Sequence, residues 1–137
     1  MLHRILTATV LALVVLPAFA HDDHIGPNGG YVKHVGSAEL ELVTDGAKVV
    51  VHVRDEKTGK PVTLDRSATG RAIVLVGGKT ETVPLAAVGA TLQGVAKQPV
   101  PAAAKVALAL KIPAREDIPS TTFDLGRKAE LPRGKPD

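Results

Sequence analysis

The sequence contains no cysteine and no tryptophan, and its single methionine is Met1. Without cysteine the chain can form no disulfide, and it offers neither a thiolate ligand nor a cysteine nucleophile. With one tyrosine and two phenylalanines it has few rings to stack on bases, and its 17 basic residues barely exceed its 14 acidic ones. These absences argue against a disulfide scaffold, a cysteine-dependent enzyme and a nucleic-acid-binding protein.

The first twenty residues have the three parts of a secretory signal. Residues 1–4 are short and basic, residues 5–16 are almost purely apolar, and Ala18 and Ala20 are the small residues that a signal peptidase reads. The alternative is an uncleaved anchor, but a spanning helix needs about 20 apolar residues. We therefore expect residues 1–20 to be removed, leaving a mature protein with no membrane span, in the periplasm if the source is Gram-negative. The lack of cysteine after the signal excludes a lipid-attached amino terminus.

The mature sequence divides by composition into three parts. Residues 21–37 are rich in histidine and glycine and predict a flexible leader, and residues 127–137 predict a flexible tail. Between them, residues 38–126 are rich in valine, leucine and threonine, and turn residues interrupt them at regular spacing. This middle part predicts a single domain.

Alternating apolar residues predict short strands throughout the middle part. Residues 48–54 place Val49, Val51 and Val53 on one face, and Asp45-Gly46 before them is a hairpin turn signal. Further strands are expected at the ranges 38–43, 68–76, 80–85, 91–95, 105–112 and 121–125. About seven short strands without a convincing helix predict an all-β fold, a small antiparallel β-sandwich of immunoglobulin-like form.

Histidine and aspartate gather at the mature amino terminus. His21, Asp22, Asp23 and His24 are consecutive, and His34 follows ten residues after His24. Imidazole and carboxylate together suit divalent cations such as Cu(II), Ni, Zn and Co, and cleavage after Ala20 would add a free amine beside His21. The mature chain has no sulfur ligand of the kind that cuprous copper carriers use. The alternative is a polar leader with no ligand at all.

Two further acidic residues lie just after His34. Glu39 and Glu41 fall on the outer face of the strand predicted at 38–43, where we expect them to be solvated, and Glu39 is the one that could complete a site with His34. His52 alternates with the valines of the next strand and is expected to be an ordinary surface histidine. No nucleophile elbow, zinc-protease helix motif or phosphate-binding loop is present, so we expect no enzyme.

The segment from His24 through residues 25–30 to His34 and residues 39–43 resembles the start of some periplasmic adaptor subunits of heavy-metal efflux pumps, of the cobalt-zinc-cadmium and copper-silver types. The resemblance continues, with short motifs, over most of the mature chain. It implies a β-sandwich that binds or senses divalent metal in the periplasm and hands it to an efflux complex. By position, His24 and His34 match histidines of those proteins, whereas Glu39 stands where many of them have another histidine.

The sequence thus predicts a periplasmic protein that binds a divalent transition metal through an amino-terminal cluster, with a metal-efflux adaptor or another envelope protein as partner. The expected ligands are His21, His24, His34, Asp22, Asp23 and Glu39. The alternative is a non-catalytic interaction module of the cell envelope in which the histidines are incidental.

Overall fold

The computed structural model describes residues 24–113 and 115–130 of the 137-residue chain. Within these ranges the secondary structure consists of strands and one short 3₁₀ helix, η1. The elements are β1 (His24–Ile25), β2 (Tyr31–Val35), β3 (Ala38–Asp45), β4 (Lys48–Asp55), β5 (Thr69–Val76), β6 (Lys79–Val88), β7 (Thr91–Val95), β8 (Lys105–Lys111), β9 (Thr121–Asp124) and η1 (Leu125–Glu130). No helix in the described ranges has the length and apolar character needed to span a membrane.

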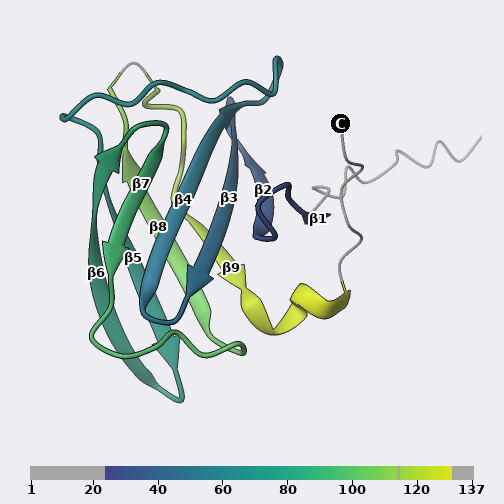
Figure 1. Cartoon of the computed structure of the whole chain (residues 1–137), viewed down its shortest axis with the longest axis vertical. Helices are drawn as coiled ribbons and strands as arrows, with labels where there is room; N and C mark the ends of the chain where they lie inside the picture. Colours follow the sequence, from purple (N-terminus) through teal and green to yellow (C-terminus); the bar gives the residue numbers. More distant parts are fainter. Residues whose placement is uncertain (1–23, 114, 131–137) are drawn as a thin grey trace, which may run out of the picture.

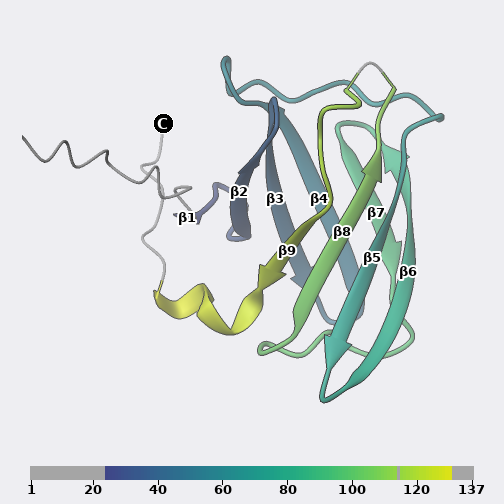
Figure 2. The same ribbon diagram turned by 180° about the vertical axis from the view of Figure 1, so that it is seen from behind.

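The described strands form one continuous antiparallel sheet in the order β1-β2-β3-β4-β7-β6-β5-β8-β9. The sheet curls into a half-barrel, with β3, β4 and β7 in front in Figure 1 and β5 and β8 in front in the opposite view of Figure 2. Its two ends approach each other: the Tyr31 ring on β2 lies edge-on to Phe123 on β9, and Lys33 Nζ donates a 2.6 Å hydrogen bond to the Thr122 carbonyl. The apolar core lies inside this curl.

The prediction of an all-β antiparallel fold is confirmed. The described residues form nine strands where the sequence predicted about seven, and one unbroken ladder of hydrogen bonds joins them. The two additional strands are β1 and β2, and the long-range pairing of β4 with β7 joins all nine into one curled sheet where the sequence predicted a sandwich of immunoglobulin-like form. Such a pairing is not encoded in any local alternation pattern.

Part of the predicted leader belongs to the sheet. Residues 24–37 contain β1 and β2, and Tyr31 and Val32 are 1% and 0% exposed. The glycine-rich residues 26–30 are the turn of this β1–β2 hairpin rather than a hinge ahead of the fold. At the other end, the first residues of the predicted tail continue η1 to Glu130. The signal at 1–20, with residues 21–23 and 131–137, lies outside the described residues.

The core is built from the alternating positions that the sequence indicated. Val49, Val51 and Val53 have no exposed surface, and each of them points inward from β4. The Asp45-Gly46 turn is confirmed between β3 and β4, and Gly46 has the positive φ of 59° that such turns need. Burial of this kind contributes roughly 1.5–3 kcal/mol per large apolar side chain and holds the curled sheet together without disulfides.

Candidate functional site

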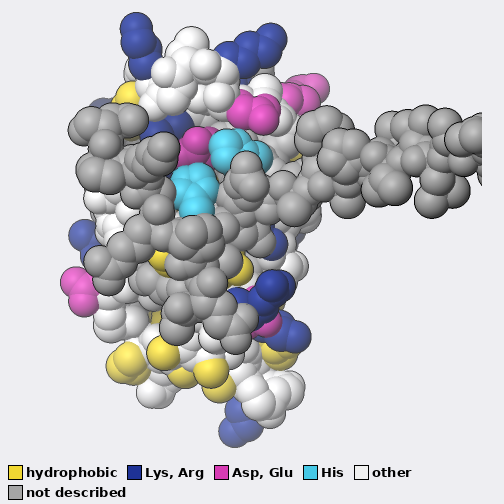
Figure 3. All heavy atoms as spheres, turned by 90° about the vertical axis from the view of Figure 1, so that its right-hand side faces the viewer, with side chains coloured by type: hydrophobic (Ala, Val, Ile, Leu, Met, Phe, Trp, Pro, Cys, Tyr) yellow, Lys and Arg dark blue, Asp and Glu magenta, His cyan; other side chains and the backbone are white. Residues whose placement is uncertain are grey.

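The β1–β2 hairpin brings two of the predicted ligands together. His24 lies on β1 opposite Val32, and His34 lies two residues further along β2. Their ring centroids are 6.1 Å apart, with the ring planes inclined at 38°. Figure 3 looks onto this side of the molecule and shows two histidine side chains next to each other, with acidic side chains beside them.

His34 sits between two glutamates. Its Nε2 atom is 4.0 Å from Glu39 Oε2, and its Nδ1 atom is 3.9 Å from Glu56 Oε1. The Nδ1 atom is buried and has no hydrogen-bond partner, which is an uncommon state for a buried polar atom. His34 therefore presents one nitrogen toward each carboxylate, in both cases beyond hydrogen-bond distance.

Arg54 fixes the orientation of Glu39. The Nε and Nη2 atoms of Arg54 donate hydrogen bonds of 3.0 and 2.6 Å to the same oxygen, Glu39 Oε1. This leaves Oε2 directed toward His34, on a side chain that is 17% exposed. A fork of this kind restricts rotation of the carboxylate more than a single lysine contact would.

The same arginine reaches a second glutamate, Glu41, through a 3.1 Å hydrogen bond from Nη1 to Oε1. Glu41 was predicted to be solvated, but it has no exposed surface. The prediction was wrong because residues 26–30 fold over this part of the outer sheet face. The backbone N–H groups of Asn28 and Gly30 donate hydrogen bonds to the Glu41 carboxylate. Burial raises the pKa of Glu41, but the hydrogen bonds from Asn28, Gly30 and Arg54 outweigh it, so the pKa lies below its usual value.

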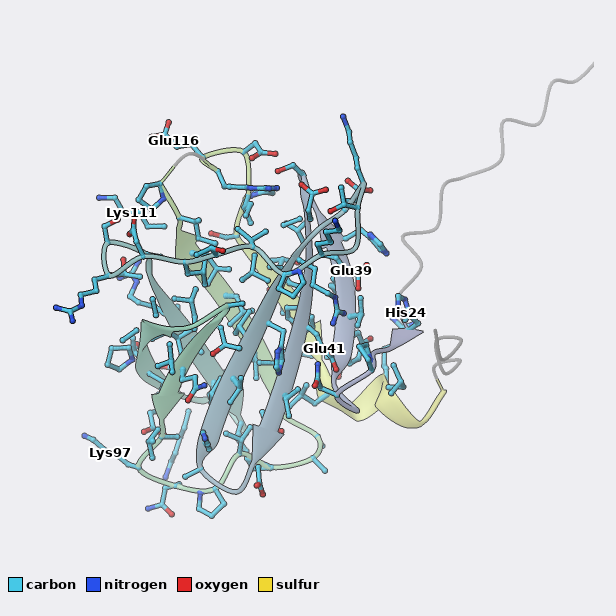
Figure 4. The ribbon with its side chains drawn as sticks, turned by 45° about the horizontal axis from the view of Figure 1, so that its top comes forward. His24, Glu39, Glu41, Lys97, Lys111 and Glu116 are labelled. Carbon is cyan, nitrogen blue, oxygen red and sulfur yellow. The ribbon has the colours of Figure 1, made fainter. Side chains whose placement is uncertain are left out.

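Figure 4 shows His24, Glu39 and Glu41 on the same side of the molecule, near β1 and β3. Glu39 and Glu56 lie within 4.0 Å of His34, and Arg54 links Glu39 to a third carboxylate, that of Glu41. The excess of negative charge makes the local potential favourable for a cation. Arg54 donates hydrogen bonds to two of these carboxylates, those of Glu39 and Glu41, and so fixes the position of their negative charge.

A cleft of about 300 Å³ opens beside His34, between β2 and the residues that lead into β9. Its lining includes Lys33, His34 and Gly36 on one side and Ser120 and Thr121 on the other. This cleft gives a small solute access to the His34 ring from the gap between the two ends of the sheet.

The structure thus brings three of the predicted ligands, His24, His34 and Glu39, to one place. In the described part of the chain, no group of three or more such side chains is close enough to hold a metal ion as it stands. The other predicted ligands, His21, Asp22 and Asp23, lie outside the described residues. His52 lies on β4 opposite Glu41, half-buried on the outer face.

The spacing of these groups fits a cation after a small adjustment. Ligand–metal distances of about 2.0–2.2 Å put two tetrahedral ligand atoms about 3.3–3.5 Å apart, and two coordinating imidazole rings about 5–5.5 Å apart between centroids. The ring spacing of 6.1 Å is wider than this range by at least about half an ångström, and the 4.0 Å gap from His34 Nε2 to Glu39 Oε2 is wider by a similar amount. The partnerless Nδ1 of His34 is a further donor atom of the right chemistry.

Sequence reasoning missed Arg54 and the burial of Glu41. The sequence did contain a signal for the burial of Glu41. Asn28 and the glycines of residues 26–30 form a turn whose amide groups can donate hydrogen bonds to an acidic side chain. Comparison with known proteins finds no family model, no curated protein and no solved structure that matches the chain. The likeness to efflux adaptor subunits therefore stays a prediction.

Proposed function

We propose that the protein binds one divalent transition-metal ion, Cu(II), Ni, Zn or Co, at the β1–β2 end of the sheet. The proximity of His24 and His34, with ring centroids 6.1 Å apart, carries this proposal. These residues are ten positions apart in the sequence, and only the hairpin brings their rings together. Two imidazoles and a carboxylate form a ligand set that suits these borderline cations.

Glu39 is the third ligand of the proposed site. Its Oε1 atom is occupied by Arg54, while Oε2 points toward His34 and is available to a cation. Hydrogen bonds that orient a ligating carboxylate in this way commonly contribute about tenfold or more to metal affinity. His21, Asp22 and Asp23 directly precede His24 in the sequence and would supply the remaining donors.

The setting of the proposed function is the cell envelope. The signal-like residues 1–20 support export, and the lack of cysteine and of any methionine beyond Met1 supports an oxidised, hard or borderline cation rather than Cu(I). The curled sheet, with one core between its two halves, is compatible with the sandwich-like architecture of exported binding proteins. Delivery of the metal to an efflux adaptor or another envelope protein is the partnership that we propose.

Isothermal titration of the chain beginning at His21 tests the proposal. We expect one-to-one binding of at least one of Cu(II), Ni(II), Zn(II) and Co(II), and a loss of affinity of about a hundredfold in His34→Ala, because each imidazole ligand adds several kcal/mol. His52→Ala is the matched control, since it removes the other histidine of the described residues, and should bind as the parent does.

A chain that begins at Gly26 lacks His21, Asp22, Asp23 and His24 and keeps only His34 and Glu39 of the predicted ligands, so it should bind far more weakly than the parent. If parent, His34→Ala and truncated chains bind equally weakly, the metal function is wrong. The histidines would then be incidental, and the envelope interaction module would be the reading to pursue.

A further inference from the structure

Glu41 is the one charged side chain among the described residues that has no exposed surface. Its carboxylate accepts four hydrogen bonds: from Asn28 N at 2.9 Å, Asn28 Nδ2 at 3.0 Å, Gly30 N at 2.9 Å and Arg54 Nη1 at 3.1 Å. A fully buried carboxylate is costly unless its oxygens are satisfied, and here three of the four donors come from a single turn. The proposed metal site uses none of these contacts directly.

The turn at residues 26–30 is shaped around the Glu41 side chain. A Cβ at Gly26 would lie 2.5 Å from Glu41 Cδ, and a Cβ at Gly30 would lie 2.8 Å from Glu41 Cγ and 2.5 Å from the Leu42 carbonyl oxygen. All three distances are shorter than non-bonded atoms tolerate, so the two glycines allow the backbone to lie directly on the carboxylate. The turn is closed by a 2.9 Å hydrogen bond from Gly26 N to the Gly30 carbonyl.

The strand that carries His24 is a short edge strand of the sheet. β1 is two residues long and pairs with β2 only at His24 with Val32 and Ile25 with Tyr31. A two-residue strand at the edge of a sheet is weakly anchored by its own ladder. β2 itself pairs with β3 at five positions, so the hydrogen bonds from Asn28 and Gly30 to Glu41 act on the turn and on β1 before it.

We infer that Glu41 is a positioning residue: by fastening the turn at residues 26–30 to β3, it holds His24 beside His34. The effect of Glu41 on metal affinity rests on the proposed function. The attachment of the turn to β3 does not depend on it. Glu41 lies behind the turn, so it acts through the place of His24 and not as a ligand. Arg54 links the attachment of the turn to the proposed metal site, because it donates hydrogen bonds both to Glu41 and to Glu39.

The metal-free protein tests the fastening by hydrogen exchange measured with NMR. In Glu41→Gln, one acceptor oxygen becomes an NH₂ group facing N–H donors. We expect the Asn28 and Gly30 amides to exchange at least about tenfold faster, while the β3 and β4 amides keep their protection. The His24 ring-proton shifts should move toward those of an unstructured peptide.

Glu39→Gln is the matched control, because Glu39 shares Arg54 but contacts no residue of the turn through any recorded hydrogen bond. It should leave the Asn28 and Gly30 amides protected. Asn28→Ala is a second variant that removes a donor from the surface of the turn without touching the core. It should speed the hydrogen exchange of the same amides, by a smaller factor than Glu41→Gln does. The test therefore remains possible if Glu41→Gln fails to fold. Unchanged exchange of the Gly30 amide in both Glu41→Gln and Asn28→Ala would overturn the inference.

Titration with Co(II), followed by its visible absorption, tests the consequence for metal. We expect Glu41→Gln to keep one-to-one stoichiometry, with about tenfold weaker binding and an altered d–d band, because the His24 imidazole is held less firmly in place at the cation. A variant that binds with parental affinity and an identical spectrum would overturn the positioning role while the proposed function stands. If the parent chain binds no Co(II), Cu(II), Ni(II) or Zn(II), the proposed function fails, and the exchange data still decide whether Glu41 fastens the turn.

Discussion

The ring of Tyr31 meets the ring of Phe123 edge-on, with centroids 5.6 Å apart and planes at 90°. One residue lies on β2 near the start of the described chain and the other on β9 near its end, so this pair joins the two ends of the sheet. Lys33 Nζ reinforces the junction by lying 5.5 Å from the Phe123 ring centroid. The cleft beside His34 lies next to this junction, which connects the integrity of the curl to the proposed site.

Replacing Phe123 with alanine should therefore destabilise the protein strongly. Phe123 is fully buried, and loss of a buried phenylalanine commonly costs about 3–5 kcal/mol. Urea unfolding followed by circular dichroism measures the change. Val95→Ala is the control, since Val95 is 72% exposed and its truncation should change the free energy of unfolding by less than about 0.5 kcal/mol. Equal effects of the two substitutions would contradict the closure of the core at this pair.

Much of this fold follows from local patterns in the sequence. The alternation of valines on β4 and the turn at Asp45-Gly46 predict the β3–β4 hairpin at close range, and this prediction is confirmed. The pairing of β4 with β7 and the approach of β2 to β9 involve residues far apart in the chain, so no local period reports them. β2 was missed because the glycines before it outweighed Tyr31 and Val32, two good strand formers.

Gly36 and Gly46 provide a test of backbone packing at matched conformation. Both have φ of 59°, but a Cβ at Gly36 would lie 2.3 Å from the Asp117 carbonyl oxygen, while at Gly46 nothing lies within 4 Å. Gly46→Ala should cost only the left-handed strain, about 1 kcal/mol. Gly36→Ala should cost at least about 2 kcal/mol, because the loop that carries Asp117 must move as well. Thermal and urea unfolding of both variants measure these losses of unfolding free energy. Equal losses would contradict the packing of the Asp117 loop against Gly36.

The ion pair between Asp55 and Arg115 predicts an acid-sensitive part of the stability. The hydrogen bond from Arg115 Nη2, 2.9 Å long, is the main cause that lowers the pKa of Asp55 to about 2 from an ordinary value of 3.8. Because the folded pKa is depressed, this contribution is complete above about pH 4 and is lost as the pH falls toward 2.

Arg115→Gln should accordingly be less stable than the parent at pH 7, and the difference should vanish near pH 2. Urea unfolding midpoints at several pH values between 2 and 7 measure it, with the exposed Arg66→Gln as the control. A gap between parent and Arg115→Gln that stays constant down to pH 2 would exclude the pairing as its cause.

The candidate site could be predicted only in part. His24, His34 and Glu39 were singled out by their residue types and spacing, and the hairpin does bring them together. Strand alternation alone did not assign Glu41 and Arg54, because it places both on the outer face, and the fold shows that residues 26–30 cover this part of it. Burial that a loop creates over a polar face leaves no trace in strand periodicity.

Arg54→Lys should weaken metal binding while leaving the fold intact. Lysine keeps the positive charge but loses the fork that holds Glu39 Oε1, so Oε2 would no longer be fixed toward His34. We expect affinity to fall by about tenfold in isothermal titration. The same exchange at Arg71, an exposed residue of β5, should have no effect. Parental affinity in Arg54→Lys would show that Glu39 is not a ligand.

The most direct measurement is a crystal structure of the chain beginning at His21, grown with Zn(II) or Cu(II), with anomalous data collected on both sides of the metal absorption edge. The proposed function predicts one strong anomalous peak on the β1–β2 hairpin, within about 2.0–2.3 Å of an imidazole nitrogen of His24 and of His34. A peak at His52 alone, or no peak although the crystals contain metal in excess, would contradict it.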